Sequence, residues 1–110
     1  MAKDDYFKIV YVILEELYGC RKANQRIDLE AISPKRLGIE AGYLLSILEE
    51  LLENGYIKGF IVKHSKTGKY AMNLEEIEIT MNGIEYLQEN LKMKQIYKMA
   101  KEIKDFIPGM

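Results

Sequence analysis

Three observations along this chain predict an α+β fold. An apolar helical pattern over residues 40–54 ends at Asn54-Gly55, a sequence typical of a helix C-terminus. Two β-branched and aromatic runs then flank a basic, glycine-containing turn at residues 66–69, which predicts an antiparallel hairpin. Residues 76–79 alternate as a strand does and lead into a helix that Thr80 can cap. This order of elements is typical of a winged helix-turn-helix with a small β-wing and a C-terminal helix.

Length and composition indicate one small intracellular domain. The 110 residues suffice for a single hydrophobic core, and contents of 48% apolar and 30% charged residues are ordinary for globular proteins. The longest uncharged apolar stretch, Ile9–Leu14, is far shorter than the roughly 20 residues of a membrane span, and no secretory signal is visible. Cys20 is the only cysteine, so no internal disulfide can form. We therefore expect one cytoplasmic domain over residues 1–110, with no membrane association.

The individual helices follow from periodicity and from capping residues. Gly19 stands where an apolar first helix would commonly end, and Ser33-Pro34 is a typical helix start. Residues 27–29 fit either a short strand or the entry to a small helix, and the sequence leaves both open. The predicted helices lie near residues 5–19, 34–37, 40–54, 81–91 and 93–107.

The third predicted helix has one apolar face and one mixed face. At 100° per residue, the apolar face is about 120° wide and is expected to cover the core. It carries Ala41, Leu44, Leu45, Leu48, Leu51 and Leu52. The opposite face carries Tyr43, Ser46 and Ile47 beside Glu50 and Glu53. We expect Tyr43, Ser46 and Ile47 to face DNA or a protein partner.

A net charge of −1 conceals basic and acidic segments that alternate along the chain. Residues 54–74 contain four lysines and no acid, so the predicted wing is cationic. Such side chains and neighbouring hydroxyls are what phosphate contacts require. The residues expected to contact duplex DNA are Lys35 and Arg36 on the second helix and Lys63, Lys66, Thr67 and Lys69 on the wing. The third helix has glutamates and no Lys or Arg, and each glutamate near a phosphate would cost about 1 kcal/mol or more.

Catalytic chemistry finds little support in the sequence. General acid–base catalysis and metal binding need histidines, cysteines or carboxylates that converge on one pocket. His64 is the only histidine and is expected to be a solvated residue of the wing. Cys20 is either a small packing residue or a thiol whose pKa is lowered by Arg21 and Lys22. We predict that the protein is not an enzyme and uses no cofactor or metal.

A protein-interaction module is the alternative to a DNA-binding protein. Tyr43 and Ile47 stand one turn apart on a helix face without a core of its own to fill. The last predicted helix also needs a partner for its apolar stripe, which comprises Met93, Ile96, Tyr97, Ala100, Ile103 and Ile107. We expect this helix to pack mainly on the first helix and to form a weak homodimer through the remainder.

Four short motifs stand out along the chain: Asp5-Tyr6-Phe7 with Leu17-Tyr18-x-Cys20, Gly55-Tyr56-Ile57-Lys58-Gly59, the run from Ile79-Thr80-x-x-Gly83 to Asn90, and the ending Ile107-Pro108-Gly109. These motifs resemble those of the YjcQ-like family, small proteins of Gram-positive bacteria and their phages. The resemblance covers nearly the whole chain. It implies a winged-helix fold without established chemistry, and no catalytic residues are carried over. Together with the cationic wing, it leads us to expect a DNA-binding accessory or regulatory protein.

Overall fold

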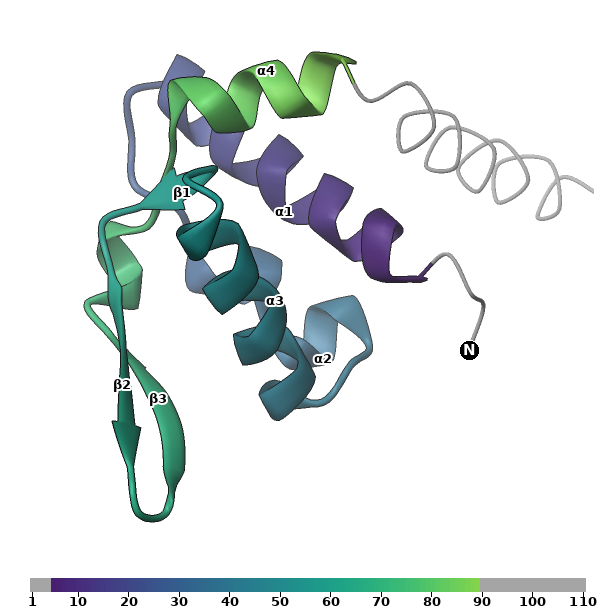
Figure 1. Ribbon diagram of the computed structural model, residues 1–110. Coiled ribbons are helices and arrows are strands. Elements are labelled where there is room, and N and C mark those ends of the chain that lie inside the picture. Colours follow the sequence, from purple (N-terminus) through teal and green to yellow (C-terminus); the bar gives the residue numbers. More distant parts are fainter. Residues whose placement is uncertain (1–4, 90–110) are drawn as a thin grey trace, which may run out of the picture.

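The computed structural model describes residues 5–89, and its elements follow the predicted order. Before the hairpin come α1 (Asp5–Lys22), the 3-10 helix η1 (Leu29–Ile32), α2 (Pro34–Leu37) and α3 (Ala41–Glu53). Next are β1 (Ile57–Lys58), β2 (Ile61–Ser65), β3 (Gly68–Met72), the 3-10 helix η2 (Leu74–Glu76), β4 (Glu78–Ile79) and α4 (Met81–Glu89). The β2–β3 hairpin extends beyond the helices as a wing (Figure 1). The predicted α+β, winged-helix architecture is confirmed.

Helix α1 runs one turn further than Gly19, so its predicted end is wrong. Asn24 adopts the left-handed conformation with φ 55°, and the Gln25 and Asn24 amides donate to the carbonyls of Cys20 and Arg21. This is the hydrogen-bonding pattern that glycine usually provides at a helix C-terminus. The Arg21 Nη1 atom donates to the Ile79 carbonyl at 2.9 Å. A contact to a distant strand thus accompanies the extra turn, and periodicity alone gives no indication of it.

The segment after α1 forms a small helix, which decides between the two alternatives for residues 27–29. The Asp28 carboxylate accepts a hydrogen bond from the Glu30 amide at 3.0 Å and caps η1. Ser33 then caps α2 by accepting from the Arg36 amide at 3.1 Å. The predicted start of α2 at Ser33-Pro34 is confirmed.

The strands form two separate two-stranded sheets rather than one continuous hairpin from residue 57. Antiparallel pairing joins β1 to β4 through Ile57 opposite Ile79, and β2 to β3 from Ile61 opposite Met72 to Ser65 opposite Gly68. Gly59 separates β1 from β2 at φ 100°, and a Cβ atom there would lie 2.0 Å from the Glu76 carbonyl oxygen. Only glycine fits this close approach of two backbone segments. The chain can therefore leave the first sheet and begin the wing.

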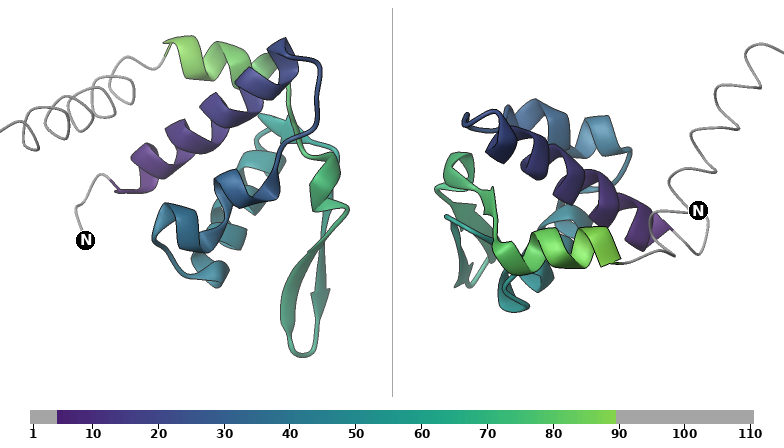
Figure 2. Two further views of the ribbon diagram at one scale, coloured as in Figure 1. Left: turned by 180° about the vertical axis from the view of Figure 1, so that it is seen from behind. Right: turned by 90° about the horizontal axis from the view of Figure 1, so that it is seen from above.

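The wing-to-helix join locks α4 against the first sheet. The Thr80 hydroxyl donates to the Gly55 carbonyl and also accepts from the Gly83 amide at 3.0 Å, which confirms Thr80 as the cap. A Cβ atom on Gly83 would lie 2.2 Å from the Tyr56 carbonyl oxygen, so α4 meets this backbone directly. Helix α4 lies beside α1 in both views of Figure 2. The predicted helix over 93–107 lies outside the described residues.

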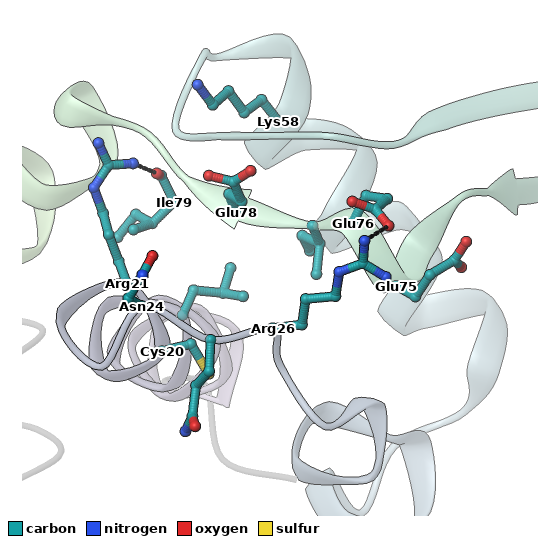
Figure 3. A pocket seen from close by; sticks show the side chains of 12 residues that line it. Cys20, Arg21, Asn24, Arg26, Lys58, Glu75, Glu76, Glu78 and Ile79 are labelled. Atoms are coloured by element: carbon teal, nitrogen blue, oxygen red, sulfur yellow. Dashed lines mark hydrogen bonds and ion pairs between the residues drawn. The ribbon is translucent and has the colours of Figure 1, made fainter.

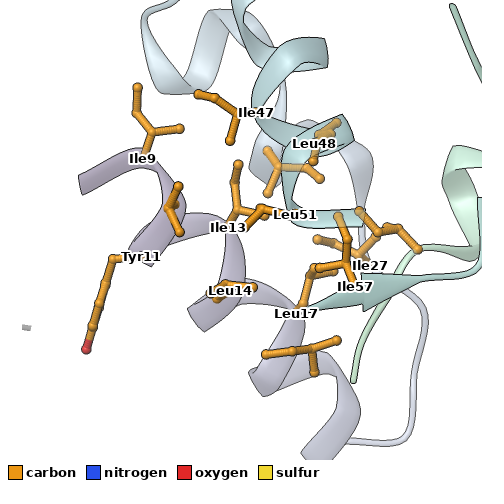
Figure 4. Packing of buried hydrophobic residues seen from close by; sticks show 14 of the residues in the cluster. Ile9, Tyr11, Ile13, Leu14, Leu17, Ile27, Ile47, Leu48, Leu51 and Ile57 are labelled. Carbon is orange, nitrogen blue, oxygen red and sulfur yellow. The ribbon is translucent and has the colours of Figure 1, made fainter. Parts of the chain in front are cut away.

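The core lies between α1, α3 and the β1–β4 sheet, and it includes Ile47. Ile13 and Leu14 of α1, Ile47 of α3 and Ile79 of β4 have no exposed surface. Ile47 lies opposite Ile9 and Ile13 (Figure 4). The prediction that Ile47 faces outward is therefore wrong.

The error in the prediction for α3 is a rotation of its buried face. The buried residues are Leu44, Ile47, Leu48 and Leu51, whereas Leu45 and Leu52 are only half-buried. Those two leucines lie on the flank of α3 that leads to Glu49, where side chains of the wing make contact. Because the wing shields that flank, the side of α3 that meets α1 is turned toward Ile47.

Candidate nucleic-acid interface

The side chains predicted to contact DNA lie in two groups on opposite sides of α3. Lys35 and Arg36 are exposed on α2, and the remaining cations are on the wing. Figure 1 shows α2 and the β2–β3 hairpin flanking α3. The structure therefore brings the predicted phosphate-binding residues to both margins of α3 rather than into one patch.

The wing ends in a tight two-residue turn, Lys66-Thr67, which is held by Ser65. The Ser65 hydroxyl donates to the Gly68 carbonyl at 2.9 Å and accepts from the Thr67 amide at 3.3 Å. The two hydroxyls of Ser65 and Thr67 lie 3.1 Å apart. Lys66 is exposed at this tip. The hydrogen bonds of Ser65 thus order the backbone that carries Lys66. The Thr67 hydroxyl already has a partner within the turn, the Ser65 hydroxyl.

The two faces of the wing differ in what they contact. Alternation along paired strands places His64 and Lys69, which lie opposite each other, on one face. The Lys69 Nζ atom lies 2.7 Å from Glu49 Oε1, and the His64 Nε2 atom lies 3.1 Å from Glu49 Oε2. The hydrogen bond from Lys69, followed by that from His64, lowers the pKa of Glu49 although its desolvation opposes this. We call the three residues Glu49, His64 and Lys69 the wing clamp.

The wing clamp changes the interpretation of Lys69. Its ammonium group already has an anionic partner on α3, so a phosphate would have to compete with Glu49. Lys63 alternates with His64 and points to the other face, where it is exposed. Within residues 5–89, no ion pair involves Lys63, Lys66, Lys35 or Arg36. The sequence did not indicate the clamp, because Glu49 and Lys69 are 20 positions apart.

The outward side of α3 is acidic. Tyr43 is 37% exposed, Ser46 is half-buried, and the exposed residues around them include Glu50 and Glu53. Burial raises the pKa of Tyr6 to about 12, and a hydrogen bond from its hydroxyl to the Glu50 carboxylate adds to the shift. A side chain of α1 thus contacts the exposed Glu50. This side of α3 repels phosphate.

Aromatic side chains from four elements gather beside this acidic side, a feature that the sequence patterns did not predict. We call Tyr6, Phe7, Tyr43, Tyr56 and Tyr86 the aromatic face. The rings of Tyr6 and Phe7 meet edge to face with centroids 5.3 Å apart, and those of Tyr56 and Tyr86 stack at 4.5 Å. Tyr43 and Tyr86 lie close enough to Tyr6 to contribute to its raised pKa. No local pattern indicated this cluster, because its members come from α1, α3, α4 and the residue directly before β1.

A cleft of about 510 Å³ lies beside the C-terminal end of α1, against β4 and η2 (Figure 3). Both basic and acidic side chains line this cleft. Arg26 pairs with Glu76 at 2.9 Å, and Arg21 donates a hydrogen bond to the Ile79 carbonyl. Burial raises the pKa of the Cys20 thiol, and the Glu16 carboxylate raises it further. The hypothesis that Arg21 and Lys22 lower this pKa is therefore wrong. Among the described residues, no group of three or more His, Cys, Asp or Glu side chains could hold a metal ion.

No helix within residues 5–89 is both long enough and apolar enough to span a membrane.

Comparisons with known proteins identify the family. No curated protein and no solved structure is significantly similar to the chain. The family model of the YjcQ protein matches residues 11–106, which is most of the 110 residues. The chain therefore belongs to the YjcQ family.

Proposed function

We propose that this winged-helix protein binds duplex DNA as an accessory or regulatory protein, mainly through its wing. The observation that carries the proposal is the placement of four exposed cations without acidic partners on both margins of α3. They are Lys35 and Arg36 on α2 and Lys63 and Lys66 on the wing. Phosphate contacts supply most of the affinity for DNA and require such cations.

The acidic side of α3 limits what such binding can recognise. Base edges are read by side chains that enter a groove, whereas contacts to phosphate position the protein without reading sequence. Glu50 and Glu53 keep the centre of α3 away from phosphates, so few base contacts are available. We therefore propose binding with strong salt dependence and weak sequence preference.

The test is a fluorescence anisotropy titration with random duplex DNA at two salt concentrations. Lys63→Glu with Lys66→Glu should weaken binding at least about tenfold and lower the salt slope by about 2, since each phosphate contact contributes about 0.9. Lys8→Glu with Lys22→Glu on α1 makes the same change in net charge and should have a much smaller effect. Lys69→Gln should also have a small effect, because Lys69 is already paired with Glu49.

A protein-interaction module without DNA binding is the second candidate function. The acidic side of α3 favours it, because Glu40, Glu50 and Glu53 are exposed where a DNA-binding winged helix would meet the duplex. If the wing double variant binds duplex DNA as tightly as the unmodified protein, the DNA proposal fails and this second function replaces it.

A further inference from the structure

The aromatic face is an apolar surface that residues 5–89 cover only in part. Phe7 is 42% exposed although its ring meets that of Tyr6, and Tyr43, which lies near Tyr6, is 37% exposed. Tyr43 also lines a groove of about 630 Å³ with Pro34 and Ile39, so apolar surface continues from Tyr43 toward α2. Contiguous exposed aromatic surface of this kind marks an interaction site.

The charges around the aromatic face define what fits it. Glu50 is hydrogen-bonded to Tyr6 within the face, and Glu53 is exposed one turn further along α3. The groove beyond Tyr43 is lined by one acid, Glu40, and one base, Lys35. A matching ligand is therefore apolar along one side and carries positive charges on its flanks. This chemistry differs from that of DNA, which is anionic throughout.

The chain itself supplies such a segment directly after α4. Tyr86 belongs to the aromatic face, and Glu89, the last described residue of α4, follows less than one turn later. Residues 90–110 follow, with five lysines against Glu102 and Asp105. As a helix, residues 93–107 would be about 22 Å long. Its apolar stripe would comprise Met93, Ile96, Tyr97, Ala100, Ile103 and Ile107.

We propose that residues 93–107 dock on the aromatic face of their own chain, with the apolar stripe over Phe7 and Tyr43 and the lysines toward Glu50 and Glu53. The short connection after Glu89 gives this segment a high effective concentration, which favours it over the same segment of a second copy. The docking gives the glutamates of α3 a cationic partner within the chain. It also leaves Lys63 and Lys66 on the wing uncovered, so phosphate contacts at the wing do not require this segment to leave the aromatic face.

The test is paramagnetic relaxation in the full chain. A nitroxide is attached to Lys98→Cys in a Cys20→Ser background, because Lys98 lies on the polar side of the predicted helix. Docking should broaden the amide signals of Phe7, Tyr43 and Glu50 until they are lost. A nitroxide at Lys66→Cys, on the tip of the wing, is the matched control and should leave the Phe7 signal intact. Broadening confined to residues next to α4 would overturn the proposal.

Two double variants test whether charge holds the segment in place, and one mixed sample distinguishes docking within one chain from docking between two copies. Lys94 and Lys101 lie seven positions apart, hence on one flank of the predicted stripe. Lys94→Glu with Lys101→Glu should restore the lost signals, whereas Lys22→Glu with Lys66→Glu should not. Mixing isotope-labelled protein without nitroxide with unlabelled nitroxide-bearing protein should leave Phe7 and Tyr43 unchanged. Loss of signals in this mixture would show that a second copy occupies the face and would overturn docking within the chain.

Discussion

Replacement of Ile47 by alanine tests the packing of α3 directly. Ile47 has no exposed surface and lies opposite Ile9 and Ile13, so the substitution removes three carbon atoms from the core. At about 0.8 kcal/mol per buried methylene, the transfer term is about 2.4 kcal/mol. A cavity term adds to this, which gives a loss within the usual range of about 2–5 kcal/mol. For a domain of this size, a loss of about 3 kcal/mol lowers the melting temperature by roughly 12–24 °C.

Ile61→Ala is the matched control for this prediction. It removes the same three carbon atoms from the wing, but Ile61 is 46% exposed. Its transfer term is therefore about half as large, and little or no cavity is left. Thermal unfolding followed by circular dichroism measures both variants. If Ile47→Ala melts within a few degrees of Ile61→Ala, the burial of Ile47 is refuted and this residue returns to the outward side of α3.

Two other substitutions test contacts that the structure adds. Glu49→Gln should speed amide hydrogen exchange in the wing, because it removes the anion that holds Lys69. The pKa of Glu49 is lowered in the folded protein, so the clamp stabilises the wing fully at pH values above the ordinary glutamate pKa, and this stabilisation is lost as the pH falls through the lowered pKa. The same loosening should therefore appear in the unmodified protein only under acidic conditions; equal exchange in both proteins at pH 7 would contradict the wing clamp. Gly83→Ala should lower the melting temperature, because its Cβ atom would lie 2.2 Å from the Tyr56 carbonyl oxygen. Gly42→Ala is the control, because no atom lies within 4 Å of a Cβ atom at this helical position, and it should stabilise the protein by roughly 0.5–1 kcal/mol. If Gly83→Ala and Gly42→Ala changed the melting temperature equally, the close contact of α4 would be disproved.

The predictions that held rest on local physical chemistry. Ser33-Pro34, Asn54-Gly55 and Thr80 mark helix boundaries because their own side chains or φ angles satisfy the terminal backbone groups. Gly55 takes the left-handed conformation with φ 77°, and Thr80 bonds to the Gly83 amide as the sequence predicts. Such contacts span at most a few residues, so the sequence contains all of the information that they require.

The predictions that failed depend on contacts between distant segments. The periodicity of α3 shows an apolar stripe but not which flank the wing will shelter, and the prediction for Ile47 is wrong for this reason. The partner of Lys69, Glu49, lies 20 positions earlier on another element. Sequence patterns alone therefore predicted that Lys69 is available to contact DNA. The aromatic face likewise includes Tyr6, Tyr43 and Tyr86, which come from three different helices and which no sequence motif connects.

The distribution of charge decides which part of this winged helix can meet a nucleic acid. Glu49 is paired with Lys69 inside the wing clamp, but Glu50 and Glu53 remain exposed on the outward side of α3. Each of these glutamates near a phosphate costs about 1 kcal/mol or more, whereas Lys63 and Lys66 have no acidic partner within residues 5–89. If the protein binds duplex DNA as proposed, the contact should therefore be favourable at the wing and unfavourable along α3. A cationic segment such as residues 93–107 reverses this preference, because the same glutamates attract it. The proposed DNA contact and the proposed docking of residues 93–107 therefore involve different charges of one small domain.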